Sequence, residues 1–291
     1  MDVHAMTTDP TGEPAGRATP GTAPAGRATP GTAPAKVSLS DVSLWYRTGQ
    51  SEHFALRDVV LDLAEGEFLS IVGPSGCGKS TLLKLVAGLL EVSSGRVMID
   101  GVPKRPGVPP NVGLVFQNDA ILPWRTVLEN VRLPLVGTGL SKADQVRRVR
   151  ELLDVVNLSS FADFFPGQLS GGMRKRVALA RTLAYDPDLF LMDEPFGPLD
   201  AQTRIRLGGE FLEIWEGVGK SVVFVTHDVE EAIALSDRVV VMSAAPGTIK
   251  AEFRIDLPRP RDFYEVRFEP AFKELHRQIW HSLSEEHGTD E

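Results

Sequence analysis

The sequence predicts an α/β fold with a buried parallel sheet, and three observations support this prediction. Three short, almost continuously apolar segments, DLFLMDEP at 188–195, SVVFVTHD at 221–228 and DRVVVMS at 237–243, are separated by helical patterns, as expected for strands covered on both faces. The glycine-rich stretch GPSGCGKST at 73–81 lies between an apolar strand pattern and a helical one. The 291 residues are 42% hydrophobic and 24% charged, an ordinary globular composition that suits one large domain or two modest ones.

The N-terminal part of the folded region is rich in predicted strands. They cover residues 37–46 (VSLSDVSLWY), 59–63 (VVLDL) and 67–73 (EFLSIVG), and the turn-forming stretches RTGQSE and AEG separate them. The pattern TLLKLVAGLL at 81–90 predicts a helix. Two further strands are predicted at 95–101 (GRVMIDG) and 111–117 (NVGLVFQ).

Helix signals dominate residues 118–180, which we interpret as a helical insertion. Thr126 with Glu129, and Ser141 with Asp144, have the spacing of capping boxes. The helices that they start lead to QLSGGMRKR at 168–176. A closing amphipathic helix is predicted from apolar residues spaced three and four apart, namely Phe272, Leu275, Ile279 and Leu283.

Composition and charge bound the organisation of the chain. PAGRATPGTA occurs at 14–23 and again at 24–33, and a segment with so few large apolar side chains cannot offset its ordering entropy. We therefore expect a disordered tail over 1–36, one folded domain over 37–260, and a C-terminal helix and tail over 261–291, with no second catalytic domain after about residue 250.

The cellular context follows from charge and from cysteine content. A net charge of −8 and a pI near 5.4 disfavour nucleic acid as a partner. The densest basic cluster, Arg147, Arg148 and Arg150, alternates with apolar residues and predicts the solvated face of a helix. The single cysteine, Cys77, suits a reducing compartment. Since we find neither a signal sequence nor an apolar run of membrane-spanning length, we expect a cytosolic protein.

The stretch 73–81 predicts a phosphate-binding loop, because Gly73 to Ser80 fits G-x-x-x-x-G-K-S between a strand and a helix. Glycines let backbone N–H groups wrap a phosphate, and the helix N-terminus adds partial positive charge. Lys79 supplies a full charge to the terminal phosphates, and the Ser80 hydroxyl suits Mg²⁺. The predicted ATP contacts in this loop are Gly73, Pro74, Ser75, Gly76, Cys77, Gly78, Lys79, Ser80 and Thr81.

Polar residues at the ends of three other strands complete the predicted site. Asp193 would complete the Mg²⁺ shell, and Glu194 would orient and polarise the attacking water. His227 could bond the γ-phosphate and hold that water in line, while Gln117 could reach the metal or the water. In the next helix, Asp228 with Glu231 can form the cap. For the nucleotide base, Tyr46 beside Trp45 predicts either a stacking platform or a core aromatic.

These motifs, in this order, resemble the ATP-binding subunit of ATP-binding-cassette (ABC) transporters from Val37 to about residue 245. GPSGCGKST resembles the Walker A motif of the family, FQ at 116–117 its Q-loop, LSGGM at 169–173 its signature, LMDEP its Walker B, PLD at 198–200 its D-loop and THD its switch histidine. The resemblance implies a P-loop NTPase core with an antiparallel β subdomain and a helical signature subdomain, an ATPase activity, and ATP and Mg²⁺ as ligands.

The resemblance further implies a head-to-tail dimer, in which each signature helix points its N-terminus at the γ-phosphate held by the other copy. The expected trans contacts are Ser170, Gly171, Gly172 and Met173, and Asp200 belongs to the D-loop. Two departures stand out. Met173 replaces the commonest glutamine, and Pro198 removes a backbone N–H from the D-loop.

Finer details resemble importers of nitrate, aliphatic sulfonates and taurine. The best single clue is LPW, whose Leu122, Pro123 and Trp124 would form either a contact with a transmembrane permease or a small core under the helical insertion. The resemblance implies a peripheral protein at the cytoplasmic face of the inner membrane, with a separate substrate-binding protein as an indirect partner.

Two other function classes compete with transport. A soluble cassette ATPase acting on nucleic acid would usually carry two cassettes or a long coiled-coil insertion, and the sequence contains neither. A small-molecule kinase on a P-loop fold would leave LSGGM without a role.

Overall fold

The computed structural model describes residues 35–48, 51–117, 120–197 and 199–284. Residues 1–34 of the predicted tail, with its tandem repeat, the Pro198 departure and the last seven residues lie outside the described residues, whereas Lys36 at the end of that predicted tail is buried and contacts Asp100. The elements below all belong to the compact unit that begins at Pro34.

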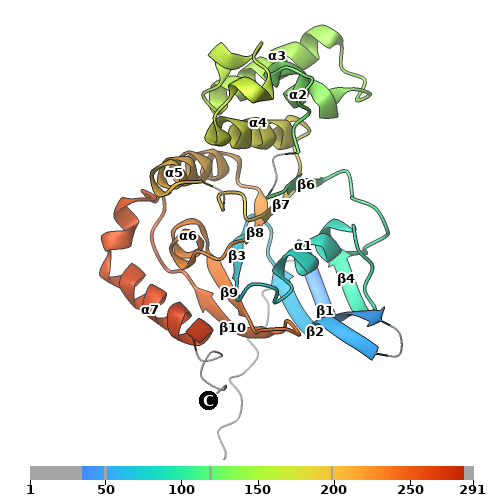
Figure 1. Ribbon diagram of the computed structural model, residues 1–291, viewed down its shortest axis with the longest axis vertical. Coiled ribbons are helices and arrows are strands. Elements are labelled where there is room, and N and C mark those ends of the chain that lie inside the picture. Colours follow the sequence, from blue (N-terminus) through green and yellow to red (C-terminus); the bar gives the residue numbers. More distant parts are fainter. Residues whose placement is uncertain (1–34, 49–50, 118–119, 198, 285–291) are drawn as a thin grey trace, which may run out of the picture. The chain divides into compact units, whose positions relative to one another are not determined.

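Six strands form the central sheet, in the order β10-β9-β3-β8-β7-β6 (Figure 1). The strands from β9 to β6 are parallel, which confirms the predicted parallel sheet, and β10 joins the edge antiparallel to β9. Strand β10 was not predicted from the sequence, because it pairs on one side only and its residues, none of them fully buried, lack the continuous apolar pattern of the central strands. The strands are β3 Phe68–Val72, β6 Val112–Val115, β7 Leu189–Asp193, β8 Ser221–Val225, β9 Arg238–Met242 and β10 Ile249–Arg254.

Four antiparallel strands form a second sheet, in the order β2-β1-β4-β5. Strand β2 begins at Ser51, eight residues before the predicted strand at 59–63, because residues 51–58 pair along the hairpin with β1. This stretch sets Phe54 and Leu56 among charged residues and shows no extended apolar pattern, whereas its backbone groups are satisfied by the partner strand. The strands are β1 Val37–Thr48, β2 Ser51–Leu63, β4 Ser94–Ile99 and β5 Val102–Pro103.

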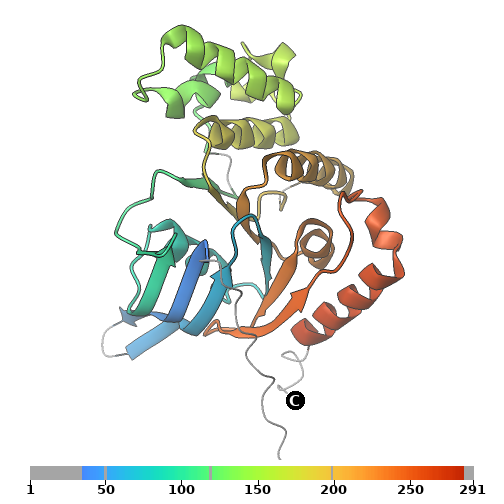
Figure 2. The same ribbon diagram turned by 180° about the vertical axis from the view of Figure 1, so that it is seen from behind.

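The helices fall into three groups, as Figures 1 and 2 show. Helix α1 packs between the two sheets, α5, α6 and α7 cover the other face of the central sheet, and α2, α3 and α4 pack on one another. The bounds are α1 Lys79–Ala87, α2 Val127–Arg132, α3 Lys142–Val155, α4 Gly171–Ala184, α5 Ala201–Val218, α6 Val229–Leu235 and α7 Pro270–Ser284; short 3₁₀ turns cover Leu133–Leu135, Ser159–Phe161, Pro166–Gln168 and Glu265–Phe268.

Alternate residues of the central strands face two different cores. Leu69 packs with Leu39 and Leu83 between the sheets, whereas its neighbour Phe68 packs with Trp215 of α5 and Phe224. A third core holds the helices α2 to α4 together. In α7, Phe272 and Ile279 are buried and Leu275 and Leu283 partly so, as the predicted closing helix requires.

The predicted helix caps are present, but only one is a complete capping box. Thr126 accepts from the Glu129 N–H while the Glu129 carboxylate accepts from the Thr126 N–H. At α3, Ser141 accepts from the Asp144 N–H, but the Asp144 carboxylate accepts from the Ser141 hydroxyl instead of from a backbone N–H. The shorter aspartate side chain therefore makes a local turn instead of the reciprocal box.

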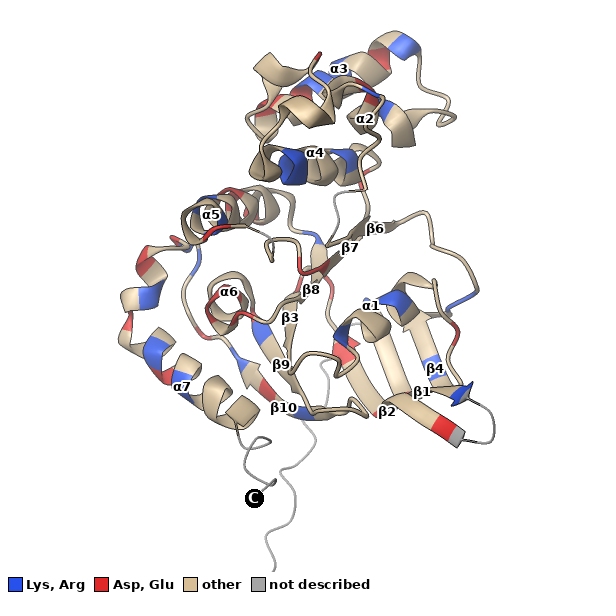
Figure 3. Ribbon diagram, viewed as in Figure 1, with Lys and Arg blue, Asp and Glu red and all other residues tan. Residues whose placement is uncertain are grey.

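Helix α3 carries the densest basic cluster of the sequence, yet acidic residues lie among the basic ones (Figure 3). Arg147 contacts Asp144 at 2.7 Å and Glu151 at 4.0 Å, and both Arg147 and Arg150 are exposed. The cluster is thus a solvated helix face with charges of both signs.

Candidate ATP site

The phosphate loop, residues 73–81, leaves the carboxyl end of β3 and enters α1. Every residue of β3 is buried, so the loop has a rigid base. Gly76 and Gly78 have φ values of 78° and 102°, which a residue with a Cβ rarely adopts. An added Cβ at Gly73 would lie 2.9 Å from both Cys77 Sγ and the Met242 carbonyl oxygen. Around them, Pro74 and Thr81 are half-buried and Ser75 is exposed.

Lys79 lies inside the loop instead of pointing to solvent. Its side chain is only 6% exposed, and its Nζ donates to the carbonyl oxygens of Gly73 and Pro74, at 2.8 Å each. Cys77 Sγ lies 3.8 Å from the same nitrogen. Burial raises the pKa of the Cys77 thiol although Lys79 opposes the shift, so this cysteine is a packed, protonated wall of the cradle.

The turn around Gly247 supports the loop from behind, and the sequence analysis did not assign it a role. Gly247 donates to the Ala55 carbonyl of β2 at 3.0 Å. An added Cβ at Gly247 would lie 2.0 Å from the Cys77 carbonyl oxygen, and one at Gly78 would lie 2.8 Å from that of Ala55. Both glycines therefore allow backbones far apart in sequence to touch behind the loop.

Tyr46 of β1 is 50% exposed, so it is not a core residue. Its ring is therefore available for stacking on a base. Its neighbour Trp45 is half-buried and packs on Phe54 with ring centroids 5.4 Å apart. Within the described ranges, no hydrogen bond joins the Tyr46 side chain to residues 73–81.

Ser80 and Asp193 meet across two elements. Ser80 lies in the first turn of α1 and Asp193 ends β7, and the Ser80 hydroxyl donates to Asp193 Oδ1 at 2.8 Å. The parallel strands β3 and β7 flank β8 and bring their carboxyl ends to one edge of the sheet, which is why residues 113 positions apart touch. Two hard oxygen donors beside a phosphate cradle fit Mg²⁺, which takes few protein ligands and completes its shell with phosphate and water.

Two polar side chains, from the ends of two strands, converge on one carboxylate oxygen of Glu194, which follows a third strand. Glu194 Oε2 accepts from Gln117 Nε2 at 3.4 Å and lies 3.3 Å from His227 Nδ1. Gln117 follows β6, Glu194 follows β7 and His227 follows β8, and these strands are neighbours in the sheet. Glu194 has a φ of 44°, a strained conformation for a residue with a side chain. Its amide is fixed by donating to the Val225 carbonyl at 2.9 Å.

Lys175 connects this cluster to helix α4. Its Nζ, which is buried, donates to the carbonyl oxygen of Gln117. The sequence analysis left Lys175 without a role, because a lysine next to a helix start reads as a solvated charge. The bond ties the segment after β6 to the helix that begins at Ser170.

The stretch QLSGGMRKR contains the start of helix α4. This helix start lies outside the cluster around Glu194. Ser170 is exposed and is the N-cap, and its hydroxyl accepts from the Met173 N–H at 3.3 Å. Gly171 has open surroundings, with the nearest atom 3.7 Å from an added Cβ. Gly172 instead packs on α5, where an added Cβ would lie 3.1 Å from Thr203 Cγ2, and Met173 packs partly into the core of the helical group.

Asp200 caps helix α5 and is exposed. Its Oδ1 accepts from the Thr203 N–H at 2.9 Å, and this bond lowers the pKa of the Asp200 carboxyl. In the part of the chain that the structure describes, no hydrogen bond joins Ser170 or Asp200 to the phosphate loop. The structure therefore brings Ser80, Asp193, Gln117, Glu194 and His227 together, while it leaves Ser170 and Asp200 exposed elsewhere and packs Gly172 and Met173 against neighbouring helices.

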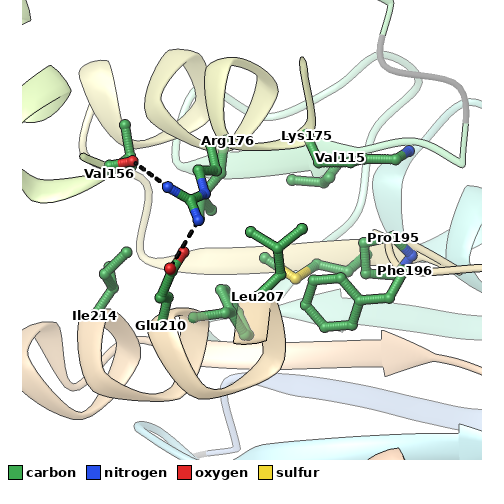
Figure 4. A pocket seen from close by; sticks show the side chains of 12 residues that line it. Val115, Val156, Lys175, Arg176, Pro195, Phe196, Leu207, Glu210 and Ile214 are labelled. Atoms are coloured by element: carbon green, nitrogen blue, oxygen red, sulfur yellow. Dashed lines mark hydrogen bonds and ion pairs between the residues drawn. The ribbon is translucent and has the colours of Figure 1, made fainter. Parts of the chain in front are cut away.

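A mainly apolar pocket lies between α4 and α5, away from the phosphate loop (Figure 4). Arg176 of α4 reaches down to Glu210 of α5 at 2.7 Å and donates to the Val156 carbonyl at 3.4 Å. Burial lowers the pKa of Arg176, and the Glu210 carboxylate opposes that shift. This ion pair joins the helical group to the core.

Comparison with known proteins places these features in a family. A model of the ABC transporter family matches residues 56–197. The chain is 51% identical over 215 residues to an uncharacterized ABC transporter ATP-binding protein of Methanocaldococcus jannaschii, covering 74% of this chain and 80% of the relative. It is 43% identical to a taurine import ATP-binding protein of Roseobacter denitrificans (84% and 94% covered). It is also 43% identical to a nitrate import ATP-binding protein of Synechococcus elongatus, of which the match covers 36%, against 82% of this chain.

Solved structures agree with the sequence comparisons. A dimeric structure of a bacterial ABC transporter cassette has a TM-score of 0.68 and 35% identity, covering 76% of this chain and all of that one. A dimeric post-hydrolysis cassette bound to ADP and Pi has a TM-score of 0.67, with the same identity and coverage. Among the described residues, no helix has the length and apolar character needed to cross a bilayer.

Proposed function

This chain belongs to the ATP-binding proteins of ABC transporters, of the importer type, and is an ATPase; on that premise we propose that it drives uptake of a small anion such as nitrate, an aliphatic sulfonate or taurine. The observation that carries the catalytic part is the convergence of Gln117 and His227 on Glu194 Oε2, beside the Ser80–Asp193 pair. Names of similar proteins support the substrate class.

Each residue of the cluster has a proposed role. Lys79 leaves the carbonyl oxygens of its own loop to neutralise the terminal phosphates, and Ser80 and Asp193 hold Mg²⁺. Glu194 accepts a hydrogen bond from the attacking water, and His227 and Gln117 fix the direction of that carboxylate. Tyr46 stacks on the base.

Two copies complete the site head to tail. The exposed Ser170, the open backbone at Gly171 and the partial positive charge of the α4 N-terminus would face the γ-phosphate held by the second copy. Asp200 would lie at the same contact. ATP then joins the two copies, and hydrolysis releases them.

The permease would dock on the exposed segment around Trp124. Its side chain is 70% exposed, Pro123 is exposed too, and Leu122 is half-buried. The segment is held in place because Asn130 Oδ1 accepts from the Leu122 N–H at 2.7 Å and Asn130 Nδ2 donates to the Leu122 carbonyl. A rigid apolar surface of this kind favours the permease contact over the core interpretation. The protein would thus sit at the cytoplasmic face of the membrane, with a substrate-binding protein on the far side.

The substrate class is tested in liposomes that contain the two ATPase copies, the permease and the binding protein encoded near this gene. We expect ATP hydrolysis to rise with taurine, an alkanesulfonate or nitrate, and to stay basal with an uncharged sugar of similar size. Stimulation by DNA or RNA, without any response to these anions, would overturn the importer proposal.

A further inference from the structure

His227 sits in a segment that neighbouring residues hold on both sides. Before it, the Thr226 hydroxyl donates to Glu231 Oε2 at 2.7 Å and accepts from the Asp228 N–H at 3.0 Å. After it, Asp228 Oδ1 caps α6 by accepting from the N–H groups of Glu230 and Glu231. The imidazole itself is 55% exposed and contacts Glu194. Its direction is therefore set by its backbone and not by packing of the ring.

Arg204, in the first turns of α5, reaches this segment from the side. Its Nη1 donates to Asp228 Oδ2 at 3.1 Å, and its Nε lies 3.4 Å from Glu231 Oε1. Its Nη2 donates to the carbonyl oxygen of Leu199 at 3.1 Å. One guanidinium thus joins Leu199, which precedes Asp200, to Asp228 and Glu231, which follow the histidine.

The geometry of this contact depends on arginine. A planar guanidinium offers donors in several fixed directions, so Arg204 bonds Asp228 Oδ2 and the Leu199 carbonyl oxygen at once while its Nε lies beside the Glu231 carboxylate without a hydrogen bond. An ammonium group is a compact point charge and cannot span these two acceptors. The side chain is 23% exposed, so its bonds are partly shielded from water. Asp228 uses a different oxygen for its helix cap, so the cap survives without Arg204 while the lateral support does not.

We propose that Arg204 is a positioning residue that keeps His227 directed at Glu194 and links that direction to the backbone at Leu199. The inference deepens the proposed function, in which Asp200 faces the second copy. Docking of that copy would fix the Leu199–Asp200 segment, and Arg204 would carry the constraint to the histidine. The hydrolytic cluster is then complete only in the dimer, although Arg204 itself does not touch ATP.

A double-mutant cycle tests this role with Arg204→Lys, His227→Ala and the combined variant. We expect Arg204→Lys to lower kcat by about tenfold or more, with the KM for ATP changed less than twofold. On the His227→Ala background the same change should have almost no further effect on kcat, because the residue that Arg204 positions is already gone. Arg206→Lys, an exposed arginine two residues away on the same helix, is the matched control and should keep its activity.

Independent, additive losses in the cycle would overturn the inference, as would an Arg204→Lys protein whose melting temperature falls while kcat per folded molecule stays unchanged. A different variant tests the proposed function itself. Full turnover in Glu194→Gln would show that the proposed catalytic site is wrong. If Glu194→Gln loses turnover but the losses in the cycle are additive, only the role of Arg204 is wrong.

Discussion

Helices α1 and α4 both begin with a glycine-rich stretch. The two helix starts differ in whether the residues around them supply contacts from within the same chain. At α1, Lys79 is buried and bonded to its own loop, and Ser80 meets Asp193 from another strand. At α4, Ser170 is exposed and makes only its own cap, and Gly171 has open surroundings. The first start has its partners inside the chain. The second presents a helix N-terminus outward, as expected for half of a site whose other half lies on a second copy.

The largest effect is expected from Glu194→Gln, which tests whether the contacts within the chain at α1 form a catalytic site. This substitution removes the carboxylate while it keeps the phosphate loop. We expect turnover to fall by about 10²- to 10⁴-fold while ATP binding is retained, since the loss is in water activation. Phosphate release measures turnover, and the fluorescence of a bound nucleotide measures ATP binding. Size-exclusion chromatography should show an ATP-bound dimer. Glu213→Gln, an exposed acid on α5, is the control. Unchanged turnover would remove Glu194 from the catalytic role.

The second test separates the two helix starts by mixing subunits. Lys79→Ala and Ser170→Asp should each lose about 10²- to 10³-fold as homodimers, because each removes or opposes charge stabilisation of the phosphate. Aspartate is as good an N-cap as serine, so α4 itself should stay stable. Phosphate release from the mixed dimer should recover toward half of the wild-type rate, since one composite site remains intact.

Failure of every mixture would mean that both sites must act together or that the shared site is wrong. Ser141→Ala provides a matched cap control, since Ser141 caps α3 in the same way. It should lose about 1 kcal/mol of stability and no activity.

The pH dependence of stability sharpens the comparison of the candidate ATP site with the start of α4. The segment that follows His227 contains a buried acid, Glu231, whereas the start of α4 contains none. Burial raises the pKa of Glu231 to about 7 from 4.5, although the Thr226 hydroxyl and then Arg204 and Arg267 oppose the shift and Asp228 adds to it. The native state holds this proton where the unfolded chain has released it, so Glu231 makes the protein less stable as pH rises from about 4.5 to 7.

Glu231→Gln should abolish that contribution. In urea unfolding between pH 5 and 8, the variant should gain stability relative to the natural protein as pH rises, on the order of 3 kcal/mol at most. A difference that is flat with pH would show that Glu231 is ionised throughout.

The smallest effect on hydrolysis is expected at the surface around Trp124 that we propose for the permease. Trp124→Ala should change stability by less than about 0.5 kcal/mol and leave the ATPase of the isolated protein intact, because the side chain is mostly exposed. Association with the permease, measured by co-purification from detergent, should weaken by about 2 kcal/mol or more. Trp280→Ala on α7, which is 60% exposed, should leave association unchanged.

Local chemistry made much of the molecule predictable from its sequence. The loop at 73–81, the buried strands and the start of α4 each depend on residues that are close in sequence, such as Gly76, Gly78 and Ser170. Strand β10 and the first half of β2 were not predicted, because their pairing partners and not their own side chains make them strands.

The sequence by itself determined the parts of the candidate ATP site, since a phosphate loop, an acid pair after an apolar strand and a histidine after another are short patterns with their own physics. Only the tertiary structure decided how they meet. The order β3-β8-β7-β6 puts the strand ends side by side, and contacts such as Gln117 with Glu194, Gly247 with Cys77 and Arg204 with Asp228 join residues far apart in the chain. Such contacts leave no periodic trace in a sequence, because strand order and backbone approach, not residue spacing, create them.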